Sequence, residues 1–226
     1  MSNQNGLIVQ NMSAIERVRK TIPSEVFSYT ELMFALREYK KPRDAVSVLL
    51  SSGRIIRIKK GLYVFGNDWR RSDISHEYIS NLIYGPSALS LDYALSFYNL
   101  IPEFSQSYTS ICSGRSKRFQ TPLGNFFYYG STEKRFSIQL TIRKTNSDQF
   151  IITTPCKALA DKVWTDNRFK PVSLKSYEEY FFSDLRIDKD ILHSVIDIAA
   201  LNEIAQAYQT RKITWMTEFL KKWEGM

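Results

Sequence analysis

Cysteine, histidine and long apolar runs are all scarce in this chain of 226 residues. Its two cysteines, Cys112 and Cys156, lie far apart and outside any C-x-x-C spacing, so they form no disulfide framework and are too few for a structural zinc site. No apolar run approaches the roughly 20 residues that a membrane span requires. The first twenty residues also lack the apolar stretch of a secretion signal. We therefore expect a cytoplasmic protein with no membrane partner and with two buried thiols.

Sequence signatures of the common enzyme classes are missing as well. The G-x-x-x-x-G-K-[ST], G-x-G-x-x-G, H-E-x-x-H and G-x-S-x-G motifs are all absent, and the two histidines, His76 and His193, fall in no recognisable motif. We expect no enzyme, no cofactor and no metal site. A magnesium-dependent nuclease is the enzymatic alternative, because scattered carboxylates leave no local pattern. Its candidate ligands are Asp92, Glu103, Asp161 and Asp166.

Positive charge is what the chain has in excess, with a formal net charge of +8. Residues 1–73 contain 13 Lys and Arg against 7 Asp and Glu, residues 74–173 contain 11 against 7, and residues 174–226 contain 7 against 9. The charge is densest in the first third, as expected for a segment that binds a polyanion. An ordinary basic surface is the alternative. The apolar content of 43% is ample for the cores of two modest domains.

A short helix with a basic start is predicted from Pro42 to residue 52. Proline suits the first helical position, where its missing N–H costs nothing. Val46, Leu49 and Leu50 then recur at helical spacing, and Gly53 ends the helix. The solvent face of this helix would present Arg43 and other polar residues able to contact phosphates or base edges.

A basic hairpin is predicted to follow directly. Ile56 and Ile58 would face one side of its first strand, and Arg57 and Lys59 the other. A Lys-Gly pair can turn the chain, after which residues 62–65 return as a strand of β-branched and aromatic residues. The hairpin would hold its cations beside the preceding helix, where phosphates are the natural counter-charge. A merely solvated hairpin is the alternative.

Helices over residues 14–21 and 31–39, the second capped by Thr30, and a short strand over 26–29 precede this segment. The order of three helices and a hairpin predicts a winged helix-turn-helix domain over residues 1–70, with the third helix as the recognition helix. The predicted DNA-binding residues are Lys40, Lys41, Arg43, Ser47, Ser51, Arg54, Arg57, Lys59 and Lys60.

Residues 71–226 are predicted to form a mixed domain, which makes the whole chain α+β. Short β-rich runs at 108–112, 125–129, 136–142 and 150–153 favour a small antiparallel sheet. Ser90 is predicted to cap a helix over 91–99. Further helices are predicted over 155–164, 174–184, 189–208 and 212–223, and the aromatic residues at 126–129 are expected to fill a core rather than stack on unpaired bases.

Two further groups of residues each allow more than one interpretation. A second basic group comprises Arg115, Lys117, Arg118 and Arg135, which would contact DNA backbone or an acidic partner, or would simply be solvated. In the final helix, Trp215, Phe219 and Trp223 recur at i, i+4 and i+8. Core packing is the default for such a stripe, and a partner groove or self-association surface is the alternative.

Three phrases together resemble the AbiEi family, antitoxins and autorepressors of bacterial type IV toxin–antitoxin systems that act in phage abortive infection. They are GRIIRIKKGLY at 53–63, GPSALSLDYALSFYNLIPE at 85–103 and TPCKALAD at 154–161. The third phrase usually has an acidic residue where Cys156 stands, a departure that affects any role assigned there. The resemblance spans roughly residues 15–165. The last predicted helices match the family in secondary-structure type but not in sequence.

The resemblance implies that the protein represses its own operon by binding inverted repeats in double-stranded DNA. It also implies that the C-terminal domain, residues 71–226, opposes a cognate nucleotidyltransferase toxin, directly or indirectly. Two copies on an inverted repeat are a geometric expectation, so dimers are expected on DNA. A generic winged-helix transcriptional regulator without a toxin partner is the alternative.

Overall fold

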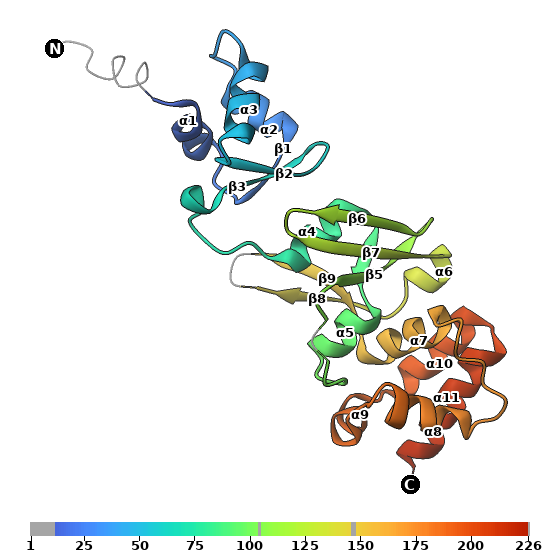
Figure 1. Cartoon of the computed structure of the whole chain (residues 1–226). Helices are drawn as coiled ribbons and strands as arrows, with labels where there is room; N and C mark the ends of the chain where they lie inside the picture. The colour runs from blue at the N-terminus through green and yellow to red at the C-terminus, as the bar shows by residue number, and fades with distance from the viewer. Residues whose placement is uncertain (1–11, 104, 146–147, 226) are drawn as a thin grey trace. The chain divides into compact units, whose positions relative to one another are not determined.

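The computed structural model describes residues 12–103, 105–145 and 148–225 of a mixed α+β protein (Figure 1). The chain divides into two compact units. We call Met1–Ile74 with Thr121–Leu123 the N-terminal unit, and Ser75–Gln120 with Gly124–Met226 the C-terminal unit. Within the described ranges, no helix combines the length and apolar character that crossing a membrane requires.

The N-terminal unit contains three helices and a three-stranded antiparallel sheet. The sheet has the order β1-β3-β2, so β3 is its central strand. In chain order the elements are α1 (Ala14–Thr21), β1 (Val26–Ser28), α2 (Tyr29–Ala35), α3 (Pro42–Ser51), β2 (Ile55–Lys59) and β3 (Leu62–Phe65), followed by a 3₁₀ turn, η2 (Asn67–Trp69).

Local sequence explains where these helices begin and end. Ser28 and Glu31 form a capping box, in which the Ser28 hydroxyl accepts from Glu31 N at 3.2 Å. The predicted cap at Thr30 is therefore wrong, and α2 starts two residues before the expected Glu31. Pro42 occupies the first turn of α3 as predicted. Gly53 follows this helix with a φ of +68°, a left-handed conformation that glycine adopts without strain.

The β2–β3 hairpin turns at Lys60 and Gly61, where Gly61 has a φ of +88°. Arg57 pairs with Tyr63, but the register then shifts so that Lys59 pairs with Leu62. This irregularity disturbs the strict alternation predicted for β2, because an extra residue in one strand changes which side chains face inward. Ile55 and Ile58 are buried, and Ile56 is only half-buried.

The core of the N-terminal unit is aromatic at its centre. The rings of Phe27 and Phe65 lie 4.7 Å apart between centroids. Arg19 covers Phe65 with its guanidinium 4.1 Å from the ring centroid and forms an ion pair with Glu25 at 2.8 Å. Because both charged side chains are nearly buried, this pair links α1 to the segment before β1 and fixes the helix against the sheet.

The C-terminal unit is built around a six-stranded sheet of order β6-β7-β5-β4-β9-β8. The sheet is mixed: β5 with β7 and β4 with β9 run parallel, whereas β4 with β5 and β8 with β9 run antiparallel. The predicted small antiparallel sheet is therefore wrong in both size and direction. Its strands are β4 (Ser87–Leu89), β5 (Tyr108–Ser113), β6 (Lys117–Thr121), β7 (Gly124–Ser131), β8 (Leu140–Lys144) and β9 (Gln149–Thr153).

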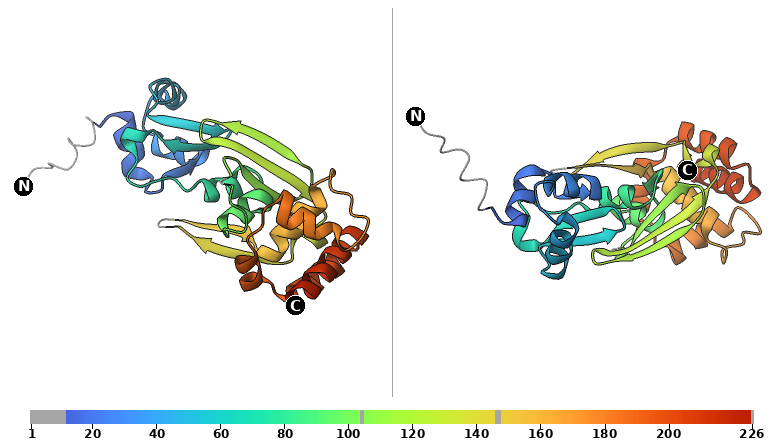
Figure 2. Two further views of the ribbon diagram at one scale, coloured as in Figure 1. Left: turned by 60° about the horizontal axis from the view of Figure 1, so that its bottom comes forward. Right: turned by 90° about the horizontal axis from the view of Figure 1, so that it is seen from above.

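Helices cover this sheet and continue beyond it. Helix α4 contacts β4, β5 and β9, and α5 contacts β5 and α7. In both views of Figure 2, α10 and α11 lie side by side at the C-terminal end, where they also contact α7. The helical elements are α4 (His76–Ile83), α5 (Leu91–Phe97), α6 (Glu133–Phe136), α7 (Pro155–Thr165), α8 (Ser176–Glu179), the π-helical η3 (Tyr180–Asp184), α9 (Lys189–Val195), α10 (Ile198–Tyr208) and α11 (Arg211–Glu224).

Several predicted elements of this unit need correction. The expected strand at 136–142 begins as the end of α6 and becomes β8 only at Leu140. The expected helix at 189–208 is two helices, because the Asp197 side chain accepts from the N–H groups of Ala199 and Ala200 and starts α10 anew. The run at 174–184 is likewise divided between α8 and η3.

Candidate nucleic-acid interface

Helix α3 presents one exposed side of the N-terminal unit. Asp44, Ser47, Val48 and Ser51 occupy positions i, i+3, i+4 and i+7, which fall on one helix face, and all four are exposed. The opposite face buries Val46 and Leu49 in the core. Helix α3 is thus anchored on one side and open to a ligand along its length on the other.

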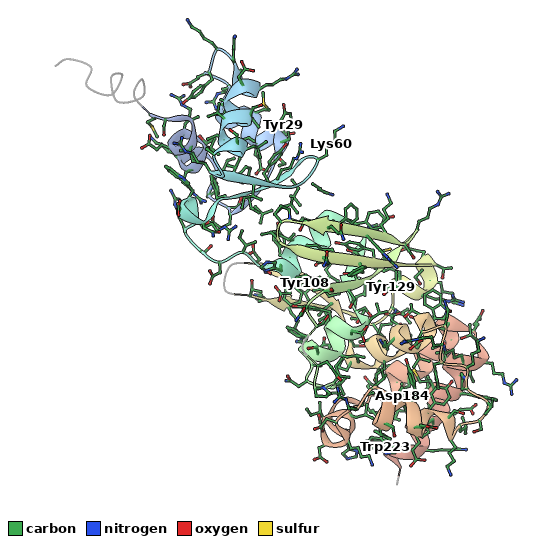
Figure 3. The ribbon with its side chains drawn as sticks, in the orientation of Figure 1. Tyr29, Lys60, Tyr108, Tyr129, Asp184 and Trp223 are labelled. Carbon is green, nitrogen blue, oxygen red and sulfur yellow. The ribbon has the colours of Figure 1, made fainter. Side chains whose placement is uncertain are left out.

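Exposed cations lie directly before and after α3 in the chain. The predicted residues Lys40, Lys41 and Arg43 are exposed at the start of α3, and in the hairpin region Arg54, Arg57 and Lys60 are exposed. Figure 3 labels Lys60 at the turn of the hairpin. Lys59 differs, because it is half-buried and its burial lowers the pKa of its ammonium group. Of the predicted DNA-binding residues, Lys59 is therefore the least suited to a phosphate contact.

The two predicted serines of α3 hydrogen-bond within their own helix. Ser47 Oγ donates to the Arg43 carbonyl at 3.1 Å, and Ser51 Oγ donates to the Val48 carbonyl at 3.1 Å. Both residues are exposed, and an exposed hydroxyl can rotate to donate to a ligand or to accept from one.

The second predicted basic group does not come together as one surface. Lys117 and Arg118 are neighbours in strand β6. Lys117 lies over the Tyr84 ring and Arg118 over the Phe127 ring. Arg115 is exposed in the turn before β6. Successive strand residues point to opposite faces, so Lys117 and Arg118 do not form a single patch.

Arg135 belongs to a different environment. Its guanidinium donates to the Tyr208 carbonyl at 2.9 Å and lies 5.1 Å from the centroid of the Trp164 ring. These contacts join α6 to α7 and to the end of α10. Arg135 is half-buried, and its side chain is used in packing the C-terminal helices.

A buried polar cluster lies in the C-terminal unit and was not predicted. Lys157 and Asp161, one turn apart on α7, are fully buried, and their Nζ and Oδ1 atoms are 2.6 Å apart. Tyr208 on α10 accepts from Lys157 Nζ at 2.7 Å and donates its hydroxyl hydrogen to Asp161. Burial lowers the pKa of Lys157 and raises the pKa of Tyr208.

Ser90 completes this cluster from the other side. Ser90 occupies the N-cap position of α5 as predicted, but its hydroxyl donates to Asp161 Oδ2 at 2.6 Å and makes no hydrogen bond to the helix. Thr153, at the end of β9, lies 3.2 Å from the Ser90 hydroxyl and donates to the Leu89 carbonyl. The available sequence signal was a Lys and an Asp at i, i+4 among the apolar residues of this helix. Because these residues are buried and hydrogen-bonded to one another, the cluster holds α7, α10 and the sheet together and offers no open reaction site.

The carboxylates of the nuclease alternative pair individually with cations. Asp92 lies 2.5 Å from Lys162 Nζ, Asp166 pairs with Arg168 at 3.3 Å, and Glu103 pairs with Arg186. Asp161 is bound in the buried cluster. Among the residues that the structure describes, no three His, Cys, Asp or Glu side chains are grouped as metal ligands.

The aromatic stripe of α11 packs on the core of the C-terminal unit. Met216 and Leu220 are fully buried. Phe219 lies 6.0 Å from Tyr177 between ring centroids, and Trp223, labelled in Figure 3, lies 5.6 Å from Phe182. Trp215 is half-buried against the same core. The stripe is occupied by intramolecular contacts.

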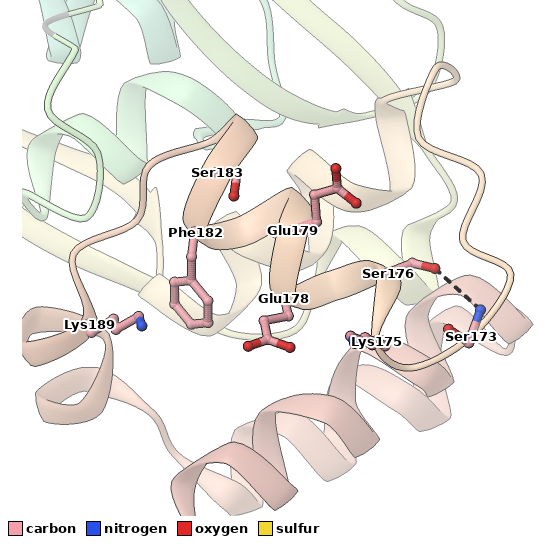
Figure 4. A pocket seen from close by; sticks show the side chains of 8 residues that line it. All are labelled: Ser173, Lys175, Ser176, Glu178, Glu179, Phe182, Ser183 and Lys189. Atoms are coloured by element: carbon pink, nitrogen blue, oxygen red, sulfur yellow. Dashed lines mark hydrogen bonds between the residues drawn. The ribbon is translucent and has the colours of Figure 1, made fainter.

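A surface pocket of about 520 Å³ lies among α8, η3 and the start of α9 (Figure 4). Lys189 approaches the Phe182 ring at 4.8 Å, and the Ser176 hydroxyl accepts from Ser173 N at 3.3 Å. Two lysines and two glutamates line the pocket, so its charges balance and select no sign of ligand. The lining residues are Ser173, Lys175, Ser176, Glu178, Glu179, Phe182, Ser183 and Lys189.

No protein-family model matches this chain, and its sequence matches none of the curated proteins with which it was compared.

Proposed function

We propose that the N-terminal unit is a winged helix-turn-helix domain that binds duplex DNA. Helix α3 would enter the major groove as the recognition helix, and the β2–β3 hairpin would be the wing. The observation that carries this proposal is the exposed face of α3, together with the exposed cations at the start of α3 and in the hairpin that follows it in the chain. The element order, three helices with a hairpin after the third, is the order that this motif requires.

Electrostatics supports DNA as the ligand. Six of the predicted cations are exposed, and the only carboxylate on the exposed stripe of α3 is Asp44, 3.9 Å from Lys41 Nζ. Contacts with phosphates release condensed counterions, so each one contributes a salt-dependent term to affinity. The six cations are Lys40, Lys41, Arg43, Arg54, Arg57 and Lys60.

We further propose that the protein represses its own operon and counteracts a nucleotidyltransferase toxin encoded beside it. The resemblance to the AbiEi family supports this part. Two of the three phrases that carry the resemblance contribute to one buried cluster, through Ser90 from the second phrase and Lys157 and Asp161 from the third. These two sequence segments therefore contribute to the packing of the C-terminal unit, which would be the antitoxin domain.

A gel-shift experiment tests the DNA proposal. Purified protein is titrated into DNA from upstream of its own gene, with an unrelated duplex of equal length and base composition as the control. We expect preferential retardation of the upstream DNA, and a second, slower complex if two copies fill an inverted repeat. Equal retardation of both duplexes would contradict autorepression, and no retardation would contradict DNA binding.

Co-expression tests the antitoxin proposal. The adjacent reading frame is expressed alone and together with this protein, and cell growth is measured. We expect a nucleotidyltransferase whose toxicity is suppressed by co-expression. An adjacent frame without toxicity, or a toxin that is not suppressed, would leave the protein as a winged-helix regulator only.

A further inference from the structure

The exposed stripe of α3 carries one apolar side chain among polar ones. Its four members are Asp44, Ser47, Val48 and Ser51. Asp44 is a carboxylate, and each exposed serine hydroxyl can rotate to donate to a ligand or to accept from one. Val48 stands in the middle of the stripe with 59% of its surface exposed. The stripe therefore offers polar oxygens and one isopropyl group.

The isopropyl group of Val48 matches one base of the major groove. Thymine presents a C5 methyl group there, an apolar partner that adenine, guanine and cytosine lack. A serine hydroxyl can pair with donors or with acceptors, so the preference among bases that this stripe offers comes from Val48.

We infer that Val48 is a specificity-determining residue of α3 that contacts a thymine methyl group. This inference rests on the proposed DNA-binding function and names one base that the site prefers. The exposed cations at the start of α3 and in the hairpin supply affinity that is independent of sequence, whereas Val48 adds a preference that only a methylated pyrimidine satisfies.

Deoxyuridine replacement tests this inference directly, because it removes the C5 methyl group of thymine and leaves the pairing edge intact. Duplexes are first selected from a randomised pool with the purified full-length protein. Each thymine of the best duplex is then replaced in turn by deoxyuridine, and the affinity is measured. The expected loss at the contacted position is about fourfold, the value of one buried methyl group.

Variant proteins identify the side chain responsible. Val48→Ala should bind the thymine duplex about fourfold or more weakly and should no longer distinguish thymine from deoxyuridine. Val172→Ala is the matched control, because Val172 is 84% exposed in the C-terminal unit, and it should behave as the unmodified protein. Circular dichroism confirms that both variants are folded, as expected for exposed positions.

Two results would overturn the inference while leaving DNA binding intact. One is equal affinity for the thymine duplex and for every deoxyuridine duplex. The other is a Val48→Ala variant that retains the methyl discrimination of the unmodified protein. If no duplex is enriched and none is bound, DNA binding itself fails, and the inference falls with it.

Discussion

The hydroxyl of Ser90 lies 2.6 Å from Asp161 Oδ2, although the two residues are 71 positions apart in the sequence. Ser90 stands between β4 and α5, and Asp161 lies inside α7. Both side chains are fully buried. Their hydrogen bond therefore fixes α7 against the end of a central strand of the sheet, and Asp161 in turn binds Lys157 and Tyr208.

Replacing Lys157 with methionine is expected to destabilise the C-terminal unit by about 3–5 kcal/mol. The variant Lys157→Met keeps the volume of the side chain but leaves Asp161 as a buried charge without its cation. Chemical denaturation of the full chain, followed by circular dichroism, measures the change in unfolding free energy. An unchanged midpoint would contradict the role given to this ion pair.

A double variant separates loss of pairing from loss of packing. Lys157→Met combined with Asp161→Leu removes both charges, and replacing a buried pair by apolar residues is often neutral. We expect the double variant to regain only part of the stability lost in Lys157→Met, because the buried Ser90 and Tyr208 hydroxyls lose their acceptor on Asp161. A double variant as unstable as the sum of the two single variants would show that the charges are not coupled.

Removing two exposed hairpin cations should weaken DNA binding equally for all sequences. Arg57→Ala with Lys60→Ala is expected to make the slope of log affinity against log salt shallower by about 2, one for each lost phosphate contact. The matched control is Lys175→Ala with Lys222→Ala, which removes two exposed lysines from the net acidic segment after residue 173. An unchanged slope in the hairpin variant would exclude the hairpin from the interface.

Both thiols should be unreactive in the folded protein. Cys112 and Cys156 are buried, and burial raises the pKa of each, so little thiolate forms near pH 8. Titration with a thiol-specific chromogenic disulfide should detect no fast reaction in the native state and two thiols per chain in denaturant. Fast reaction of either cysteine in the native protein would show that its surroundings open readily.

Gly66→Ala is expected to destabilise the N-terminal unit. A Cβ atom at this position would lie 2.0 Å from the carbonyl oxygen of Gly53, a backbone atom that cannot rotate away. The cost of such overpacking is about 1–3 kcal/mol or more. Thermal unfolding measures it, with Gly225→Ala as the control, because a Cβ there meets its nearest atom at an ordinary 3.6 Å. Equal melting temperatures for the Gly66→Ala and Gly225→Ala variants would contradict the close approach of Gly66 to the Gly53 carbonyl.

The N-terminal elements were predictable because local chemistry determines them. Pro42 and Gly53 mark the ends of α3, and Leu62–Phe65 is the strand that its β-branched and aromatic residues indicate. The errors there are also local. Ser28, rather than Thr30, caps α2 because it forms a capping box with Glu31. The register shift after Arg57 changes which isoleucines are buried.

The C-terminal unit was less predictable because its sheet depends on pairings between distant segments. Strand β4 has only three residues, too few for a periodic signal, yet it joins β5 to β9 at the centre of the sheet. Turn residues identify where strands end but not which strands become neighbours. The cluster around Asp161 was missed for the same reason, since Ser90, Thr153 and Tyr208 reach it from three other parts of the chain.

The salt dependence of DNA binding tests the central claim most directly. Fluorescence anisotropy of a duplex from the protein's own upstream region gives the affinity of the full chain at several salt concentrations. With four to six phosphate contacts for each copy, the slope of log affinity against log salt should be about −4 to −5, a loss of roughly 10²–10³-fold between 50 and 200 mM salt. A flat salt dependence, or no binding at low salt, would contradict the account.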